Sequence, residues 1–276
     1  MSLLGVSSKM LAMAYLLSAT KLKSYAQCPR AYYFRYEYGL KKPSVFGAAV
    51  LGTALHGALA QLYQDWHYQD PLPSEEWLRY CWENQIGALT AAQLEEGWQI
   101  LQRYFETEIV PLGVMKRPLA TEGRIQGLTQ MNGLEFKLTG RYDRLDSLED
   151  GLELIDYKSA KNPTMPAADM VDLQLGLYSL ALEQCYGKLL RRMSLLFLRT
   201  GERVTYEVTY EHRRQVEAVI GELALRLLDE KDWQPKCGEQ CGQCAYVRYC
   251  SAVEAEPDPL PEVRQKTRKL QLCLSF

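Results

Sequence analysis

Apolar and polar residues alternate along two neighbouring runs in the middle of the chain, and this pattern predicts a β-hairpin. The runs are residues 138–147 and 152–158, and Glu149-Asp150-Gly151 between them is a turn signal. A loop with an even number of residues places Asp143 opposite Asp156. A three-residue loop would send the two carboxylates to opposite faces, because side chains alternate along a strand.

The expected register follows from an even loop. Leu145 then faces Leu154, Ser147 faces Leu152, and the loop runs from Leu148 to Gly151, where glycine can take a positive φ. A two-residue loop, Glu149-Asp150, preserves the same pairing.

Three ionisable residues of this hairpin are unusual for a strand. Asp143 lies in the first strand, and Asp156 and Lys158, two apart on the second, point to one face. Opposed Cβ atoms would be about 5 Å apart, close enough for both carboxylates to hold one Mg²⁺ or Mn²⁺. Lys158 could then act on a water or a phosphate. The alternative is an exposed hairpin with a surface ion pair.

The periodicity of the flanking segments predicts an α/β domain with the hairpin at its centre. Residues 1–17 are expected to be a leader, possible disorder included, and residues 251–276 a proline-rich and basic tail. The elements expected between them are a short helix from Ser18 or Thr20 to Gln27, a helix over 45–66 carrying His56, a helical insertion over 71–111, a strand over 120–127 carrying Glu122, a helix over 165–186 carrying Gln174 and Tyr178, a hairpin over 195–210 and a helix over 211–230.

Composition describes an ordinary globular protein. The 276 residues are 47% hydrophobic and 24% charged, and the net charge of −2 gives no overall basic surface for nucleic acid. No apolar run is long enough to span a membrane, and the apolar residues 10–17 lack a convincing cleavage site. A cytoplasmic location is expected.

The eight cysteines are unevenly placed, and half of them crowd residues 237–250. Cys241, Cys244 and Cys250 have the short spacings of a metal or iron–sulfur site. A fourth ligand is needed. Cys28 is the candidate, which would clasp the N-terminal segment to the C-terminal end. Cys237 is its competitor, since four local thiols could bind zinc unaided.

Several short motifs together resemble the RecB-like branch of the PD-(D/E)XK nuclease superfamily. They are GTALHGAL, GRYDRLD, LIDYKSAK and QLGLY in this order, with CPRAYYFRY before them and the cysteine spacing after them. The cysteines make the chain similar to the iron–sulfur members of that branch, which include AddB-type nuclease domains and CRISPR-associated RecB-like exonucleases. Each motif is weak alone, and their order is specific.

The resemblance implies a restriction-endonuclease-like core over residues 18–250, with a central mixed sheet flanked by helices and a segment at 233–250 stapled by an iron–sulfur cluster. It also assigns the site residues. The implied metal ligands are His56, Asp143, Asp156 and the Tyr157 carbonyl, the implied catalytic residues are Asp143, Asp156, Lys158, Gln174 and Tyr178, the implied 4Fe–4S ligands are Cys28, Cys241, Cys244 and Cys250, and Glu122 matches an acidic residue on the preceding strand.

The implied activity is Mg²⁺- or Mn²⁺-dependent hydrolysis of DNA, with a preference for single strands and free ends, in DNA repair, recombination or CRISPR adaptation. The resemblance makes a helicase or a CRISPR adaptation protein an expected partner. The chain has no Walker A motif and therefore no helicase motor of its own. The alternatives are a catalytically silent DNA-binding or assembly subunit with a structural cluster, and a protein stapled by zinc. The final residues, 271–276 (QLCLSF), resemble peptides that dock on sliding clamps.

Overall fold

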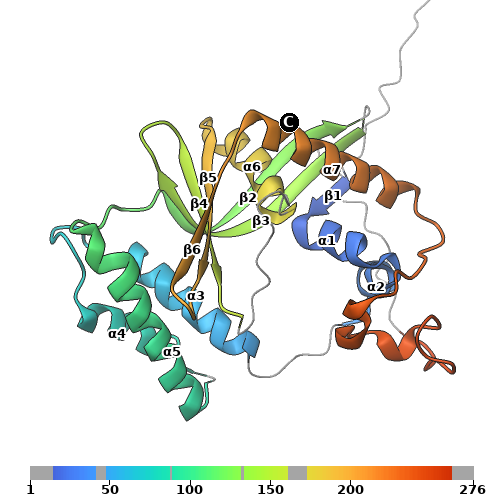
Figure 1. Ribbon diagram of the computed structural model, residues 1–276, viewed down its shortest axis with the longest axis horizontal. Coiled ribbons are helices and arrows are strands. Elements are labelled where there is room, and N and C mark those ends of the chain that lie inside the picture. Colours follow the sequence, from blue (N-terminus) through green and yellow to red (C-terminus); the bar gives the residue numbers. More distant parts are fainter. Residues whose placement is uncertain (1–14, 42–47, 88, 132–133, 161–172, 263–276) are drawn as a thin grey trace, which may run out of the picture.

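The computed structural model describes residues 15–41, 48–87, 89–131, 134–160 and 173–262, and in it a central sheet lies between two layers of helices (Figure 1). The sheet is mixed, with strands in the order β1-β3-β4-β5-β6 and β2 paired to β3. This architecture confirms the predicted α/β fold class. The strands are β1 (Tyr15–Ser18), β2 (Ala120–Met131), β3 (Leu134–Ser147), β4 (Leu152–Lys158), β5 (Leu190–Phe197) and β6 (Glu202–Glu207).

The long strand β3 organises the sheet. One edge of β3 pairs with β2 in antiparallel fashion. On the other edge, β1 runs parallel to β3 as far as the pair Ser18–Thr139, and β4 joins in antiparallel fashion only from Arg144–Ile155 onward. Among the described strands, residues 140–143 of β3 therefore have no ladder partner on this second edge, and the sheet is open there.

The predicted hairpin register is confirmed. Leu145 pairs with Leu154 and Ser147 pairs with Leu152. The N–H of Leu148 donates to the carbonyl of Gly151 over 2.9 Å, which closes a loop with an even number of residues. Asp143 and Asp156 would be the next pair in this register, but the ladder ends one position before them.

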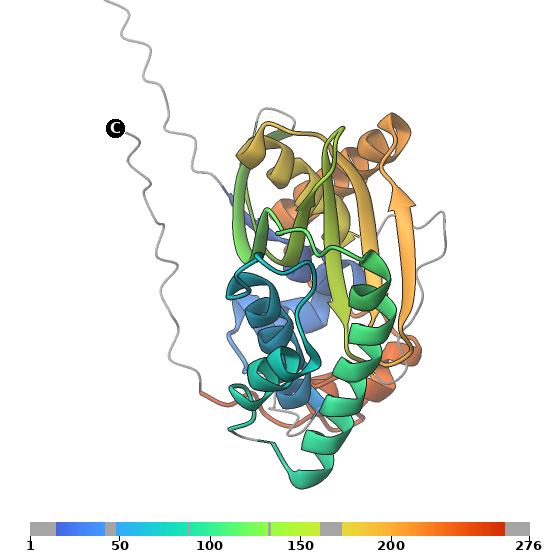
Figure 2. The same ribbon diagram turned by 90° about the vertical axis from the view of Figure 1, so that its left-hand side faces the viewer.

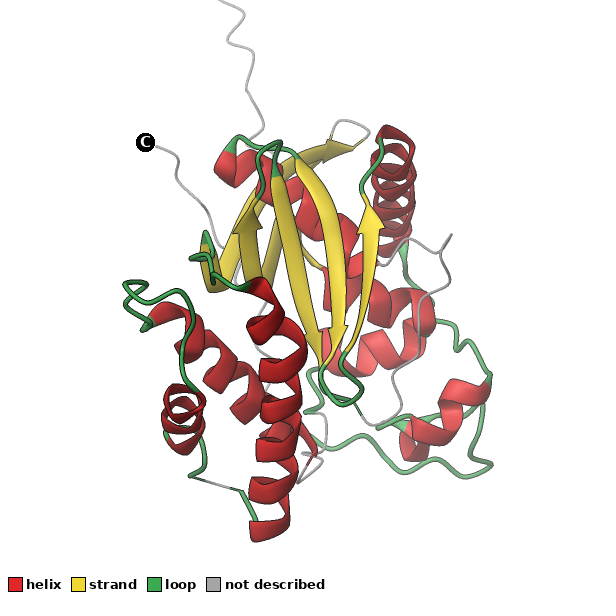
Figure 3. Cartoon of the chain, turned by 60° about the vertical axis from the view of Figure 1, so that its left-hand side comes forward, coloured by secondary structure: helices red, strands yellow, loops and turns green. Residues whose placement is uncertain are grey.

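Helices cover both faces of the sheet (Figure 3). Buried residues of α1, α6 and α7 form one hydrophobic cluster with one face, and those of α3, α4 and α5 form a second cluster with the other. None of the described helices is long and apolar enough to cross a membrane. The helices are α1 (Ala19–Gln27), α2 (Pro29–Tyr32), a π-helical turn (Tyr33–Glu37), α3 (Ala48–Gln64), α4 (Glu75–Glu83), α5 (Ala91–Tyr104), a π-helical turn (Phe105–Ile109), a 3₁₀ turn (Val110–Leu112), α6 (Leu173–Tyr186), α7 (Tyr210–Asp229) and two 3₁₀ turns (Glu239–Gln243 and Val247–Tyr249).

Local signals explain where several helices begin. The Ser18 side chain accepts the N–H of Lys21 and caps α1, as predicted, and Thr90 forms a capping box with Gln93 at the start of α5. Helices α4 and α5 lie within the predicted helical insertion and pack on α3, as Figure 2 also shows. The insertion is therefore part of the second hydrophobic cluster.

The sequence and the structure differ at the two ends of the domain. The last residues of the predicted leader, Tyr15 to Leu17, belong to β1, because Leu17 is buried in the first hydrophobic cluster. Helix α6 is described from Leu173, and the predicted start at residue 165 lies outside the described residues, as do most of the leader and the clamp-like peptide 271–276.

Candidate functional site

Helix α3 places His56 beside Glu122 of β2 and Asp143 of β3. The Nδ1 atom of His56 lies 3.1 Å from Oδ1 of Asp143 and 3.9 Å from Oε1 of Glu122. Ligand atoms from these three residues all lie within 4.8 Å of one another, the spacing of a metal site. One imidazole nitrogen and two carboxylates are donors that suit Mn²⁺ or Mg²⁺, so the residues fit the predicted metal.

A local irregularity in the sheet turns these carboxylates toward α3. The β2–β3 ladder pairs Thr121 with Arg144 and Gly123 with Tyr142, but it omits the pair between Glu122 and Asp143. Glu122 has a positive φ of 49°, a sparsely populated conformation for a residue with a side chain. Backbone strain of this kind is concentrated at functional sites.

The same irregularity reverses the side-chain alternation of β3. Tyr142 and Leu145 are three residues apart, yet both are buried in the first hydrophobic cluster. In a regular strand, residues three apart lie on opposite faces. Asp143 is the residue at which the alternation breaks, and this break lets its carboxylate reach His56 rather than the core.

Both carboxylate oxygens of Asp143 have defined partners. Oδ1 contacts His56, and Oδ2 accepts the backbone N–H of Tyr157 over 2.6 Å. Asp143 therefore replaces the missing ladder contact between β3 and the end of β4. The Tyr157 ring is buried on the α3 side of the sheet, edge-on to the His56 ring at 5.7 Å.

Asp156 and Lys158 form a close pair at the end of β4. The Nζ atom of Lys158 lies 2.5 Å from Oδ2 of Asp156, and the Asp156 side chain is only 8% exposed. Both residues pair with β5, opposite Leu195 and Phe197, so they lie on one face of the strand, as predicted. The Lys158 ammonium group balances the charge of this nearly buried carboxylate.

The charges of the site shift two pKa values. Burial lowers the pKa of His56, but its hydrogen bond to Asp143 and the charges of Asp143, Glu122 and Asp156 outweigh this effect and raise the pKa overall. Burial and the charge of Asp143 raise the pKa of Glu122, against the opposing effect of Arg141. An excess of carboxylates in a half-buried space is the electrostatic condition that a divalent cation relieves.

Helix α6 meets β3 at the open edge of the sheet. The Tyr178 hydroxyl accepts the backbone N–H of Arg141 over 3.3 Å. Its ring occupies the space where Gly140 has no Cβ, since a Cβ there would lie 2.1 Å from Tyr178 Cε1. The structure thus brings Tyr178 close to the site. Gln174 falls on the same helix, but its side chain lies outside the described part of the chain.

A buried polar network lies behind the site, on the α3 side of the sheet. Arg144 follows Asp143 in the sequence, and its guanidinium pairs with Asp146 and donates to the Tyr63 hydroxyl and, over 3.2 Å, to the Tyr104 hydroxyl. Tyr63 and Tyr104 share a 2.7 Å hydrogen bond. His56 and Tyr63 are two turns apart on α3, so the helix contacts β3 at two consecutive residues.

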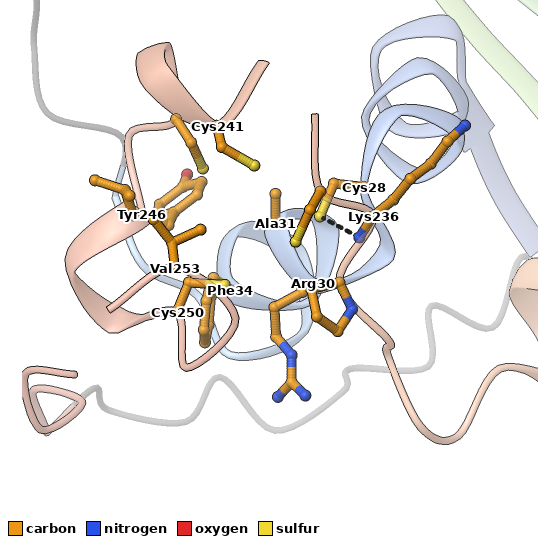
Figure 4. Close-up of a pocket in the computed structure, with 13 residues that line it drawn as sticks. Cys28, Arg30, Ala31, Phe34, Lys236, Cys241, Tyr246, Cys250 and Val253 are labelled. Carbon is orange, nitrogen blue, oxygen red and sulfur yellow. Dashed lines mark hydrogen bonds between the residues drawn. The ribbon is translucent and has the colours of Figure 1, made fainter. Parts of the chain in front are cut away.

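The structure brings together five cysteines, one near the N-terminus and four near the C-terminus, around one pocket (Figure 4). Cys28 lies at the junction of α1 and α2, and it lines this pocket together with Cys237, Cys241, Cys244 and Cys250. The backbone N–H of Lys236 donates to Cys28 Sγ over 3.5 Å. Phe34 and Tyr246 pack beside the pocket and join its two segments.

The spacing of these thiols bears on what they could bind. A tetrahedral zinc site holds its sulfur ligands about 2.3 Å from the ion, so the sulfurs lie less than 4.6 Å from one another. Among the described residues, no three of these thiols have sulfur atoms that all lie within 4.8 Å of one another. Five thiols that line one pocket could hold a metal ion or an iron–sulfur cluster.

Sequence reasoning missed the ion pair between Arg141 and Glu122, whose Nε and Oε2 atoms lie 2.9 Å apart. It also missed the buried role of Arg144. The sequence did carry one indication of these contacts. Arginine occurs two residues before Asp143 and again directly after it, within the predicted strand.

The chain is similar to a known protein family and to solved structures. A profile of the PD-(D/E)XK nuclease superfamily matches residues 16–251. A solved structure from Eubacterium rectale, described as a "Putative exonuclease", is 13% identical over 94% of this chain and 97% of that one, with a TM-score of 0.50. The structure of SSO0001 is 12% identical over 87% of each chain, with a TM-score of 0.43. No curated protein matches the sequence. The chain belongs to the PD-(D/E)XK nuclease superfamily.

Proposed function

We propose that this chain is a metal-dependent DNA nuclease that hydrolyses phosphodiester bonds from the ends of single strands. The observation that carries the proposal is the convergence of His56, Glu122 and Asp143 within metal-ligand distance of one another. The proposal adds Asp156 to this group, and the negative charge of Asp156 helps to raise the pKa of His56. Membership of the superfamily and a fold like that of the Eubacterium rectale protein support the same activity.

In this proposal, His56, Asp143, Asp156 and the Tyr157 carbonyl hold Mg²⁺ or Mn²⁺, with Glu122 as a further donor. A bound ion would polarise the phosphate and lower the pKa of a water. Asp143 presents its free lone pairs to the site, because Tyr157 and His56 fix the orientation of its carboxylate. Such fixed donors need no rearrangement when the substrate enters.

Lys158 is the proposed partner of the attacking water. Its ammonium group is held 2.5 Å from Asp156 and can donate to a water or to a phosphate oxygen. Tyr178 keeps β3 in place at the open edge, and Gln174 is proposed to line the site beside it. The net charge of −2 means that DNA binding depends on local cationic groups such as Lys158.

The thiol pocket is proposed to hold a 4Fe–4S cluster on Cys28, Cys241, Cys244 and Cys250. Cysteine thiolates are the usual ligands of such clusters, and the N–H donated to Cys28 is a typical interaction of a ligating sulfur. When bound, the cluster would join residue 28 to the C-terminal segment. Zinc is the alternative, and a broad visible absorbance band in purified protein separates iron–sulfur from zinc.

The nuclease assignment is tested with end-labelled single-stranded DNA and Mg²⁺, Mn²⁺ or EDTA. Asp156→Ala and Lys158→Ala should each abolish metal-dependent cleavage. Asp150→Ala and Lys188→Ala, which change exposed residues near the hairpin turn, should retain it. Cleavage that persists in both site variants would refute the assignment. Wild-type protein that binds DNA without cleaving it would favour the silent DNA-binding subunit instead.

The biological context is proposed from the resemblance alone. DNA repair, recombination and CRISPR adaptation are the settings in which a helicase or an adaptation protein would be the partner. Docking of residues 271–276 on a sliding clamp is tested by comparing clamp binding with and without these six residues.

A further inference from the structure

We propose that Arg141 binds the DNA phosphate next to the one that is cleaved, and thereby sets which bond enters the site. The inference rests on the proposed nuclease function and adds a substrate-positioning residue to it. It starts from the position of Arg141 on β3, two residues before Asp143.

Arg141 lies on β3 two residues before Asp143, one of the metal donors. Two residues along a strand span about 7 Å, comparable to the separation of neighbouring phosphates in an extended single strand. Arg141 also belongs to residues 140–143, the part of β3 that has no strand partner on one edge among the described strands. A DNA strand that follows this opening would meet Asp143 and Arg141 in succession.

The guanidinium of Arg141 is held in place by one ion pair, and most of the side chain is exposed. Its Nε atom pairs with Glu122 Oε2 over 2.9 Å, and the side chain is 63% exposed. In the described part of the chain, Glu122 is the only carboxylate paired with it. An arginine has five N–H donors in a planar fork, so the Nη groups are left to bind phosphate in a bidentate manner.

Glu122 connects Arg141 to the metal donors. One carboxylate oxygen, Oε2, contacts Arg141, and the other, Oε1, lies 3.9 Å from Nδ1 of His56. The Glu122 carboxylate therefore fixes the distance between the Arg141 guanidinium and the metal donors. In the proposal, the guanidinium binds one phosphate and the metal ion acts on the neighbouring phosphate.

A simple surface ion pair does not account for these contacts. An exposed ion pair contributes little stability, whereas the positive φ of Glu122 is a strained conformation for a residue with a side chain. The backbone N–H of Arg141 is also held, by the Tyr178 hydroxyl. Anchoring of both the backbone and the side chain is expected for a group that must present a fixed geometry to a ligand.

The first test separates DNA binding from metal binding in Arg141→Gln. The KM for single-stranded DNA should rise about tenfold, the loss of one charge-assisted contact, with a smaller change in kcat. The slope of log K against log salt should become shallower by about 0.7, the value for one lost phosphate contact on a single strand. Binding is measured in the Lys158→Ala background, where cleavage is removed.

Two further variants serve as controls. Arg141→Lys keeps a positive charge and should restore part of the affinity. Arg192→Gln removes an arginine with a similar exposed pair, Nε to Glu207 at 3.1 Å, from the far part of the sheet, and should leave both KM and the salt slope unchanged. The affinity for Mn²⁺ without DNA, measured by calorimetry, should change less than twofold in Arg141→Gln.

The second test identifies the phosphate. A single neutral methylphosphonate is moved along a short single strand. In the wild type, one position next to the cleaved bond should weaken binding about tenfold, and Arg141→Gln should be insensitive to that position only, because the two changes remove the same contact.

The outcomes distinguish the inference from the function on which it rests. Absence of metal-dependent cleavage by the wild type would refute the proposed function. A wild type that cleaves, combined with an Arg141→Gln variant whose KM and salt slope are unchanged, would refute the inference alone. Loss of Mn²⁺ affinity in Arg141→Gln with an unchanged salt slope would also refute it, since Arg141 would then serve only to orient Glu122.

Discussion

The contact between Gly140 and Tyr178 predicts a specific cost for one added methyl group. In Gly140→Ala, the new Cβ would lie 2.1 Å from Tyr178 Cε1, closer than real side-chain atoms approach. Tyr178 is 6% exposed and packed in the first hydrophobic cluster, so its ring has little room to move. Any movement also threatens the 3.3 Å hydrogen bond from the Arg141 N–H to the Tyr178 hydroxyl.

The magnitude follows from two opposing effects. Overpacking a core costs about 1–3 kcal/mol, and replacing glycine by alanine returns about 0.4–1 kcal/mol by restricting the unfolded chain. We expect Gly140→Ala to lower the free energy of unfolding by about 1.5 kcal/mol, which corresponds to a fall in Tm of roughly 3–6 °C for a domain of this size. DNA cleavage should fall as well, since β3 carries Asp143.

The assay is urea and thermal unfolding of matched variants. Gly87→Ala is the control, because a Cβ at Gly87 would meet nothing within 4 Å, and it should change stability by less than about 0.5 kcal/mol. In the double variant Gly140→Ala/Tyr178→Ala, the penalty of the added methyl group should disappear. Equal stability of the two glycine variants, or additive effects of Gly140→Ala and Tyr178→Ala, would refute the steric reasoning.

Three further predictions concern other parts of the molecule. Arg144→Met should lower the free energy of unfolding by about 2–3 kcal/mol in urea titrations, because it leaves Asp146 without its partner, whereas the exposed Arg124→Met should have almost no effect. In EDTA, the wild type should have a higher free energy of unfolding than His56→Gln at a pH below the ordinary histidine pKa of about 6.5. This difference should decline as the pH rises through the raised pKa of His56. A difference that grows with pH would contradict this expectation. Cys28→Ser should reduce the visible absorbance of purified protein, whereas Cys81→Ser, a buried thiol outside the pocket, should preserve it.

The hairpin was predictable because its information is local. Alternation of apolar residues and an even loop determine that Leu145 faces Leu154, whatever the rest of the chain does. The spacing of Cys241, Cys244 and Cys250 is local in the same sense. Cys28 could be proposed as their companion, and the structure places it in their pocket.

The irregularity at Glu122 and Asp143 could not be predicted in this way. A regular alternation assigns every residue of β3 to a face, and it gives no reason for Tyr142 and Leu145 to share one. The break depends on two strands distorting at the same position, with α3 supplying His56 from a distant part of the sequence. Such a combination is a property of the tertiary packing, where a local preference such as the φ of Glu122 is overruled.

The tyrosine network gives the helical insertion a meaning for protein engineering. Tyr104 is contributed by α5, and it meets Tyr63 of α3 and the guanidinium of Arg144, the residue that follows Asp143. Deletion of residues 71–111 would remove Tyr104, and with it the hydrogen bonds that support Arg144 directly behind the proposed catalytic site. A shortened version of this protein should therefore keep α5, whose Tyr104 hydroxyl also lies 3.5 Å from the hydroxyl of Tyr157.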